Sequence, residues 1–199
     1  MTDAPSMIDW DLAVRLGSRF AGEGPDVSAA AADDAVRELR AGAERSTGLV
    51  REFTSLSAAE HTAPVLVVDR AGWIKANAET FEKILTPIVG RLAAKKGTPG
   101  GISAAIGSRI TGAEVGVVLG FMGSKVLGQF DPFHDPHGRL LLVAPNVVHI
   151  ERELEVDPTD FRLWVTLHEE THRVQFTAVP WMRDHLHAQM NALADSVEV

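Results

Sequence analysis

Apolar positions recur at helical spacing through most of the first hundred residues. The amphipathic stretches lie near 9–20, 28–60 and 72–95, and glycine and proline interrupt them at 22–25 and 97–101. Between the second and third stretches, the β-branched run at 64–69 predicts a short strand or an extended connection. The pattern therefore predicts an α+β fold that is mostly helical and has a small β element.

Glycines at 112, 116 and 120 dominate the next segment, 102–128, and helical spacing places all three on one face. Such a face lets another backbone approach closely. Similar spacing occurs in membrane dimer helices, but Arg109, Glu114 and Lys125 interrupt this segment, which favours a packed core helix. Further along, the apolar run at 140–144 follows the turn-rich residues 131–138 and predicts a strand after a surface loop.

The clearest helix signal starts at Asp157, which can cap the first turn, and Pro158 fits the position after it. Pro180 ends the pattern. Helical periodicity places one set of side chains on a single stripe of this helix: Phe161, Trp164, Val165, His168, His172, Gln175 and Phe176. We therefore expect the two histidines to lie one turn apart on the inward face.

Composition narrows the possible chemistry. The 199 residues include 27 acidic and 19 basic side chains, a formal net charge of −8, which argues against nucleic acid as a partner. The chain has no cysteine, so a metal must be bound by His, Asp or Glu. The first residues lack the basic start and apolar core of a secretory signal, and the longest uncharged apolar run is too short to span a membrane. We expect a cytoplasmic protein with one domain over 1–199 and no membrane partner, whose oligomeric state the sequence does not set.

The segment His168-Glu169-Glu170-Thr171-His172 has the form HExxH. On a helix, imidazoles four residues apart converge on one Zn²⁺ ion, and the intervening glutamate reaches the water bound to it. Glu169 would take the proton of this water and pass it to the leaving amine. The motif predicts a zinc-dependent metallopeptidase that acts on a peptide or protein substrate.

Three neighbours of the motif have simpler interpretations. Glu170 points about 100° away from Glu169, and we expect it to be solvated or to support a ligand from behind. Trp164 and Trp181 flank the motif helix and are expected to pack in the core as part of a dry shell around the metal.

Several runs together resemble a known family. They are residues 112–120, 126–131 and 141–146, and the sequence HEETHRVQFTAVPWMRDHL at 168–186. They resemble the zincin-like metallopeptidases of actinobacteria and their relatives, some of which are labelled as coenzyme-biosynthesis-associated hydrolases. The likeness covers about 105–190, and Gln175-Phe176 and Pro180-Trp181 make it more specific than HExxH alone. It implies a mostly helical zincin-like fold with zinc ligands at His168 and His172 and a catalytic Glu169.

A catalytic zinc usually has three protein ligands, and the third is open here. The pattern HExxHxxGxxH is absent. If the chain returned antiparallel after Pro180, residues 188–192 would lie level with the histidines, and none of them is a good ligand. His185 and His187 are the nearest alternatives.

Two further sources of a third ligand stay open. The loop residues His134, His137, Asp131 and Asp135 could form a separate cluster of oxygen and nitrogen donors. The family resemblance implies longer relatives whose third ligand is an acidic residue further downstream, so that this domain would be truncated at its C-terminus.

Three functional hypotheses follow. A zinc metallopeptidase explains the most residues, with the strand at 140–144 as a candidate edge for pairing with an extended peptide. A non-catalytic relative would keep the helical core, and the metal if it is structural, for binding a partner. A zinc amidohydrolase acting on a small molecule would use the same zinc chemistry.

Overall fold

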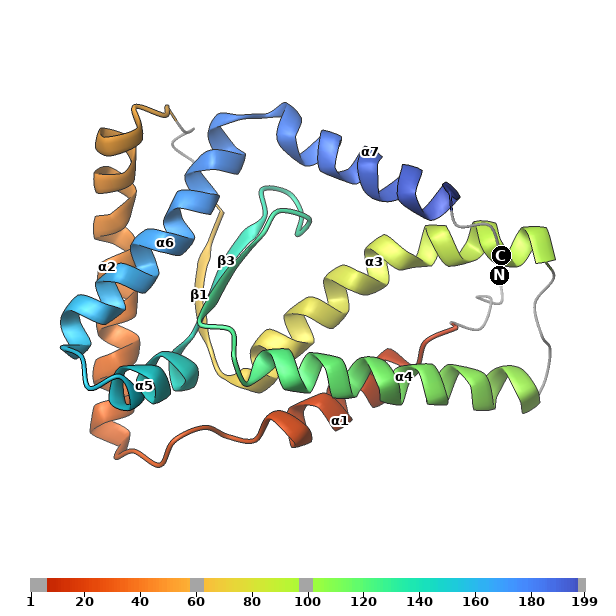
Figure 1. The fold of residues 1–199 in the computed structure, drawn as a ribbon, viewed down its shortest axis with the longest axis horizontal. Coiled ribbons are helices and arrows are strands. Elements are labelled where there is room, and N and C mark those ends of the chain that lie inside the picture. The colour runs from red at the N-terminus through yellow and green to blue at the C-terminus, as the bar shows by residue number, and fades with distance from the viewer. Residues whose placement is uncertain (1–6, 58–62, 97–101, 197–199) are drawn as a thin grey trace. The chain divides into compact units, whose positions relative to one another are not determined.

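The computed structural model describes residues 7–57, 63–96 and 102–196, and it is mostly helical with one small sheet (Figure 1). This arrangement confirms the predicted α+β class. The chain divides into two compact units, residues 1–22 with 70–125 and residues 23–69 with 126–199. The single domain expected over 1–199 stays a prediction.

Three helices form the first unit: α1 (Trp10–Ala21), α3 (Arg70–Lys96) and α4 (Ile102–Gly123). Asp9 caps α1, since its carboxylate accepts a hydrogen bond from the backbone N–H of Leu12 at 2.9 Å.

The glycine face of α4 packs against α1. A Cβ atom on Gly116 would lie 2.8 Å from the carbonyl oxygen of Ala13, and one on Gly120 would lie 2.7 Å from that of Gly17. These distances are too short for any side chain, so the close backbone approach predicted from the glycine spacing is confirmed.

Part of α4 is also long and apolar enough to cross a membrane, judged by length and composition alone. The segment is Ser103–Gly123. A single helix of this kind is weak evidence, because packed helices of other proteins have the same length and composition.

The second unit holds the sheet, whose strands are β1 (Val65–Val68), β2 (Gly128–Asp131) and β3 (Arg139–Val143). Their order is β1-β3-β2, with β1 parallel and β2 antiparallel to β3. Both predicted strands are therefore present. The proposal that 140–144 forms an edge is wrong, because β3 is buried throughout and pairs on both sides. Among the described strands, the edges are β1 and β2.

Four helices complete the second unit: α2 (Ala29–Thr54), α5 (Ala144–Glu153), α6 (Pro158–Ala178) and α7 (Trp181–Ser196). The core of this unit joins α2, β3, α5 and α6 through the buried side chains of Leu39, Ala43, Leu140, Leu142, Val147 and Val165. The core thus ties the middle of the sheet to the helix that carries the HExxH motif.

One helix boundary and one further helix differ from the sequence expectation. α2 ends at Thr54, because Ser55 adopts a left-handed conformation and its N–H bonds to the carbonyl oxygen of Arg51 at 2.9 Å. Residues 58–60 of the expected helix lie outside the described residues. α5 was not predicted; it starts directly after β3, where Asn146 is buried and donates a hydrogen bond to Val126 O at 2.7 Å.

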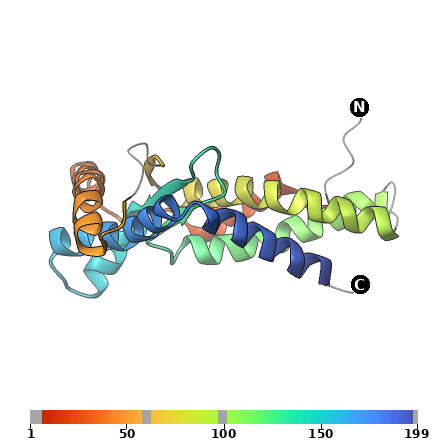
Figure 2. The same cartoon turned by 90° about the horizontal axis from the view of Figure 1, so that it is seen from above.

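The last helix does not return beside the motif helix. In both views, α7 leads away from the end of α6 (Figure 1 and Figure 2). The antiparallel return considered for residues 188–192 is therefore wrong. We attribute the difference to Pro180, which has no backbone N–H and therefore interrupts the helical hydrogen bonds between α6 and α7. This interruption lets α7 take a new direction.

Candidate metal centre

Helix α6 has the predicted ends. A carboxylate oxygen of Asp157 accepts a hydrogen bond from the N–H of Asp160 at 3.0 Å, and Pro158 occupies the first turn. The helix ends at Ala178, two residues before Pro180. His168 and His172 consequently lie one turn apart near the middle of a continuous helix.

The sequence pattern predicts that the histidines face inward, and this prediction is wrong. His168 and His172 are both exposed. The buried face of α6 consists instead of Val165, Thr166, Glu169, Glu170, Arg173 and Val174. Hydrophobic periodicity missed this face because it counts polar residues as exposed, whereas Thr166 and Arg173 are buried with hydrogen-bonding partners on other elements.

The rings of His168 and His172 lie together on the exposed side. Their centroids are 5.1 Å apart and the rings are nearly perpendicular, at 83°. Two imidazoles in this arrangement could bind one cation jointly through ring nitrogens. Among the described residues, the two histidines are therefore the candidate metal donors.

Two aromatic rings extend this row, of which Trp164 is exposed and Phe161 is half-buried. Trp164 lies 5.9 Å from His168, centroid to centroid, and Phe161 lies 5.8 Å from Trp164. Trp164 is 57% exposed and Trp181 is 63% exposed. The expectation that both tryptophans pack in the core is therefore wrong, and Trp164 forms an open wall beside the first histidine.

Glu169 lines a pocket together with Trp164 and His168. The pocket has a volume of about 260 Å³ and is lined by Val126, Leu127, Gly128, Trp164, Val165, His168 and Glu169. The Glu169 side chain is 7% exposed and has no hydrogen-bond or ion-pair partner within the described part of the chain. Burial raises the pKa of this carboxyl group to about 7, because the charged form loses hydration. Such a pKa suits a general base near neutral pH.

Gly128 on β2 makes room for this carboxylate. A Cβ atom at this position would lie 2.5 Å from Cγ of Glu169 and 2.9 Å from its Oε1. Strand β2 thus approaches α6 as closely as glycine allows. Gly128 belongs to one of the runs that carry the family resemblance, but the sequence pattern assigned it no role. A glycine at the start of a short strand is the signal that could have identified it.

Glu170 differs from the expectation of a solvated carboxylate. It is completely buried, and both of its oxygens accept hydrogen bonds from the guanidinium group of Arg173, at 2.7 and 2.9 Å. Sequence reasoning gave no role to Arg173. Its spacing of three residues after Glu170 is the usual signal for an ion pair on one helix.

The described residues supply no complete ligand set. Within 7–57, 63–96 and 102–196, no three His, Asp or Glu side chains are grouped so that they could hold a metal ion. His185 packs against Trp181, and His187 contacts Phe133 and Asn191. Neither alternative ligand therefore joins the motif histidines in this structure.

The loop that was considered as a second metal cluster has structural contacts instead. Asp131 forms a buried ion pair with Arg139 at 3.2 Å, and Asp135 forms an exposed one with Arg183 at 3.0 Å. The loop histidines His134 and His137 are not part of a three-donor group among the described residues.

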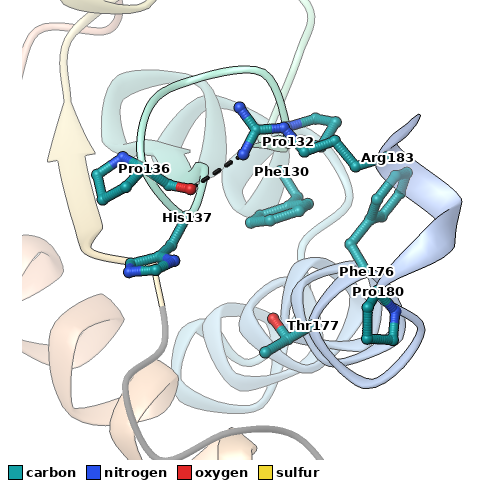
Figure 3. Close-up of a pocket in the computed structure, with 8 residues that line it drawn as sticks. All are labelled: Phe130, Pro132, Pro136, His137, Phe176, Thr177, Pro180 and Arg183. Atoms are coloured by element: carbon teal, nitrogen blue, oxygen red, sulfur yellow. Dashed lines mark hydrogen bonds between the residues drawn. The ribbon is translucent and has the colours of Figure 1, made fainter. Parts of the chain in front are cut away.

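A second pocket lies beyond the histidines, where β2 and the loop after it approach the end of α6. Figure 3 shows Phe130 and Phe176 in this pocket of about 420 Å³, with ring centroids 5.6 Å apart. Arg183 of α7 donates a hydrogen bond to the carbonyl oxygen of Pro136 at 3.0 Å and so ties the loop to α7. One pocket therefore lies beside His168, and the other lies at the C-terminal end of α6.

Comparisons with known proteins agree with these features. The family model of zincin-like metallopeptidases matches residues 8–199. The structure is similar to the crystal structure of a candidate hydrolase with a novel fold from Chloroflexus aurantiacus, with 26% sequence identity and a TM-score of 0.72. The match covers 96% of the chain described here and spans 60% of the Chloroflexus chain. A search of curated proteins finds no match.

Proposed function

Since this chain belongs to the zincin-like metallopeptidase family, we propose that it is a zinc-dependent peptidase, with His168 and His172 as metal ligands and Glu169 as general base. The observation that carries the proposal is the pairing of two imidazoles, whose ring centroids are 5.1 Å apart, with the Glu169 carboxylate, which is buried and has no partner among the described residues. The similar protein from Chloroflexus aurantiacus is likewise a candidate hydrolase.

The imidazoles of His168 and His172 fit zinc as two of its ligands. Two exposed imidazoles are typical zinc ligands, and the chain has no thiolate that would compete with them. When bound, zinc supplies a water molecule with a pKa of about 7 and polarisation of the substrate carbonyl. The site residues would supply the rest of the chemistry.

Glu169 would transfer the proton of the attacking water to the leaving amine. Its carboxylate accepts the proton of the attacking water and then donates it to the nitrogen of the leaving amine. A pKa raised to about 7 supports both steps, because the group can hold and release a proton near neutral pH. The pocket around Glu169 limits access of other water molecules, which keeps the carboxylate weakly solvated.

An extended peptide would pair with β2. This strand is an edge of the described sheet, and its first residue, Gly128, touches Glu169. An edge strand offers unpaired backbone groups to a peptide, so β2 replaces the segment 140–144 as the proposed binding edge.

Metal content tests this proposal first. Elemental analysis of purified protein should find about one zinc per chain in the wild type and none in His168→Ala or His172→Ala. His149→Ala, an exposed histidine on α5, is the matched control and should keep its zinc. His185→Ala tests the alternative ligand. A wild type without zinc would contradict the proposal.

Hydrolysis is the second part of the test. Glu169→Gln should retain the metal and lose peptide hydrolysis by roughly 10²- to 10⁴-fold, the usual contribution of a general base. Assays on a peptide library would report this loss. Unchanged hydrolysis in Glu169→Gln would exclude Glu169 as the base.

One observation favours a second candidate, a non-catalytic relative that binds a partner. The described residues contain no third metal donor near the two histidines. A protein of this kind would bind metal weakly and would hydrolyse no peptide. The peptidase would retain bound zinc and hydrolyse peptides.

A further inference from the structure

Two residues of the edge strand β2 contact α6 at different points along the helix. Gly128 approaches Glu169, and the ring of Phe130 lies 5.6 Å from that of Phe176, centroid to centroid. Gly128 and Phe130 are two residues apart, so they lie on the same face of the strand. Glu169 and Phe176 are two turns apart on one face of the helix. Strand β2 therefore runs beside α6 in the same direction, from Glu169 toward the pocket that contains Phe176.

A peptide that pairs with β2 would follow the same path. Directly paired residues of two strands point to the same face of a sheet. The peptide residue opposite Gly128 would thus lie beside Glu169, and the residue opposite Phe130 would direct its side chain toward the pocket of Phe130 and Phe176. We take the peptide to run antiparallel to β2, as β3 does, because antiparallel pairs are slightly more stable. The residue opposite Phe130 then comes first in the peptide.

The lining of this pocket is apolar (Figure 3). Three prolines, Pro132, Pro136 and Pro180, lie around the two phenylalanine rings. Both phenylalanines are half-buried, so each ring keeps surface that a ligand could cover. Proline side chains lose almost no conformational entropy on burial, and aromatic rings pack favourably against a further ring. The lining therefore favours an aromatic side chain.

The charges at the pocket do not favour an ionised side chain. Arg183 lines the pocket, but one of its nitrogens donates to the carbonyl oxygen of Pro136 and another pairs with Asp135, each at 3.0 Å. An acidic side chain would therefore meet a cation that already has a partner. None of the described residues that line the pocket carries a carboxylate for a basic side chain.

The loop beside the pocket is held in its conformation by hydrogen bonds. The backbone N–H of Phe133 donates to the Asp131 carboxylate at 3.1 Å, and that of Gly138 donates to the carbonyl oxygen of His134 at 2.6 Å. The bonds of Arg183 add a connection from this loop to α7. A pocket that is held in this way needs little ordering when a ligand enters, which favours binding.

We propose that this pocket is the specificity site of the peptidase and takes an aromatic side chain of the substrate, about two residues before the residue that lies beside Glu169. The substrate class is then a peptide with phenylalanine, tyrosine or tryptophan on the amino-terminal side of the cleaved bond. This inference rests on the proposed function, because it uses the pairing of a peptide with β2.

Paired peptides test the proposal without hydrolysis. Fluorescence anisotropy would compare peptides that differ only by phenylalanine or alanine at one position, with Glu169→Gln protein so that they stay intact. At the position assigned to the pocket, the aromatic peptide should bind about tenfold more tightly or better, the usual gain from burying such a side chain. Equal or absent binding of the two peptides, or a preference for a charged residue there, would overturn the proposal.

Two threonines of α6 give a matched pair of variants in the same background. Thr177 lines the pocket and donates to the carbonyl oxygen of Arg173 at 2.6 Å. Thr171 makes the same kind of bond to Leu167 at 2.8 Å but does not line this pocket. Thr177→Trp fills the pocket and should reduce the preference for phenylalanine to less than about threefold, whereas Thr171→Trp should keep it.

A smaller substitution covers the case in which the bulky one does not fold. Thr177→Leu adds less volume and should reduce the preference at least about twofold. An unchanged preference in a folded variant at Thr177 would overturn the proposal.

A cross-linking experiment locates the side chain directly. The peptide would carry the photoreactive residue p-benzoylphenylalanine at the position assigned to the pocket, and mass spectrometry would identify the attached segment. Attachment is expected within 130–137 or 176–183. Attachment to Leu49 or Phe53, which line another apolar pocket beside α6, would overturn the proposal. A wild type without zinc or hydrolysis contradicts the proposed function, whereas the binding ratio and the attachment site still decide what the pocket takes.

Discussion

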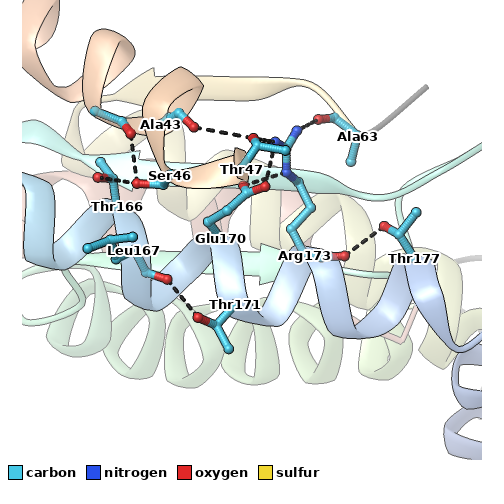
Figure 4. A network of polar contacts seen from close by, with 11 residues as sticks. Ala43, Ser46, Thr47, Ala63, Thr166, Leu167, Glu170, Thr171, Arg173 and Thr177 are labelled. Carbon is cyan, nitrogen blue, oxygen red and sulfur yellow. Dashed lines mark hydrogen bonds and ion pairs between the residues drawn. The ribbon is translucent and has the colours of Figure 1, made fainter. Parts of the chain in front are cut away.

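The polar side chains on the two faces of α6 differ in whether they have bonding partners. On the face toward α2, Glu170 and Arg173 are buried and bonded to each other and to neighbouring elements (Figure 4). On the other side, His168 and His172 are exposed, and Glu169 is buried with no partner in the part of the chain that the structure describes. One face is built for stability. The other keeps unsatisfied groups, which is typical of sites that must bind something else.

The neighbouring glutamates show the difference most directly. They have the same chemistry and lie in the same turn of the helix. Glu170 gains a bidentate partner for its charge, whereas burial without a partner raises the pKa of Glu169 to about 7. Environment alone thus separates a structural carboxylate from a candidate base.

The largest effect is expected from breaking the stable face. Arg173→Met leaves the Glu170 carboxylate buried without a partner and should lower the free energy of unfolding by about 3–5 kcal/mol. Urea denaturation measures this loss. Arg37→Met is the control, because its pair with Asp34 is exposed and should contribute no more than about 0.5 kcal/mol. Similar losses in the two variants would show that the α2-facing network is not a main source of stability.

The second effect is the pH dependence of stability that Glu169 is expected to cause. In metal-free protein, Glu169 has a pKa of about 7 when folded and about 4.5 when unfolded. Between these values the folded state binds a proton that the unfolded state releases, so stability falls as pH rises from about 4.5 to about 7. The loss is on the order of 3 kcal/mol, at about 1.4 kcal/mol per pKa unit.

Glu169→Gln should remove this pH dependence. With a chelator present, the variant should be more stable than the wild type at pH 8 and similar to it near pH 4.5, measured by urea denaturation at both values. A wild type whose stability does not fall between these pH values would mean that Glu169 is well solvated or has a partner in solution.

A smaller effect is expected from narrowing the pocket. Gly128→Ala places a Cβ atom where Glu169 now lies and should cost about 1–3 kcal/mol of stability, as overpacking usually does. It should also reduce hydrolysis, because the carboxylate must move. Gly48→Ala on α2 is the control: nothing lies within 4 Å of its added methyl group, so it should be neutral or stabilising by up to about 1 kcal/mol. Urea denaturation compares the two.

Much of this architecture could be predicted from sequence. Local signals such as Asp157, Pro180 and the glycine spacing predict the ends of α6, the strands at 64–69 and 140–144, and a face of α4 that another backbone can approach closely. That the approaching helix is α1 could not be predicted from the glycine spacing. Each signal acts within a few residues of the feature that it predicts. Such features depend little on where distant segments lie.

The orientation of α6 could not be predicted in this way. Its buried face depends on Ser46, Thr47 and Ala63, which lie more than a hundred residues earlier in the chain. The stripe predicted from periodicity left out Thr166, Glu170 and Arg173, because polar side chains usually face solvent. The order of the strands was missed for a related reason: β2 is only four residues long, and its place at the edge is set by pairing with β3.

The smallest effect on stability is expected at the open face itself. Trp164 is 57% exposed, so Trp164→Ala should change the free energy of unfolding by less than about 1 kcal/mol, far below the roughly 3–5 kcal/mol typical of a buried aromatic residue. Its ring lines the pocket of Glu169 and lies beside His168, so the same substitution should raise KM for peptide hydrolysis. Trp181→Ala, at 63% exposure on α7, should leave both quantities unchanged. Steady-state kinetics and urea denaturation of the two variants measure these effects. A large stability loss in Trp164→Ala would show that this ring stabilises the fold. A change in KM alone would assign the ring to the side of α6 that binds substrate.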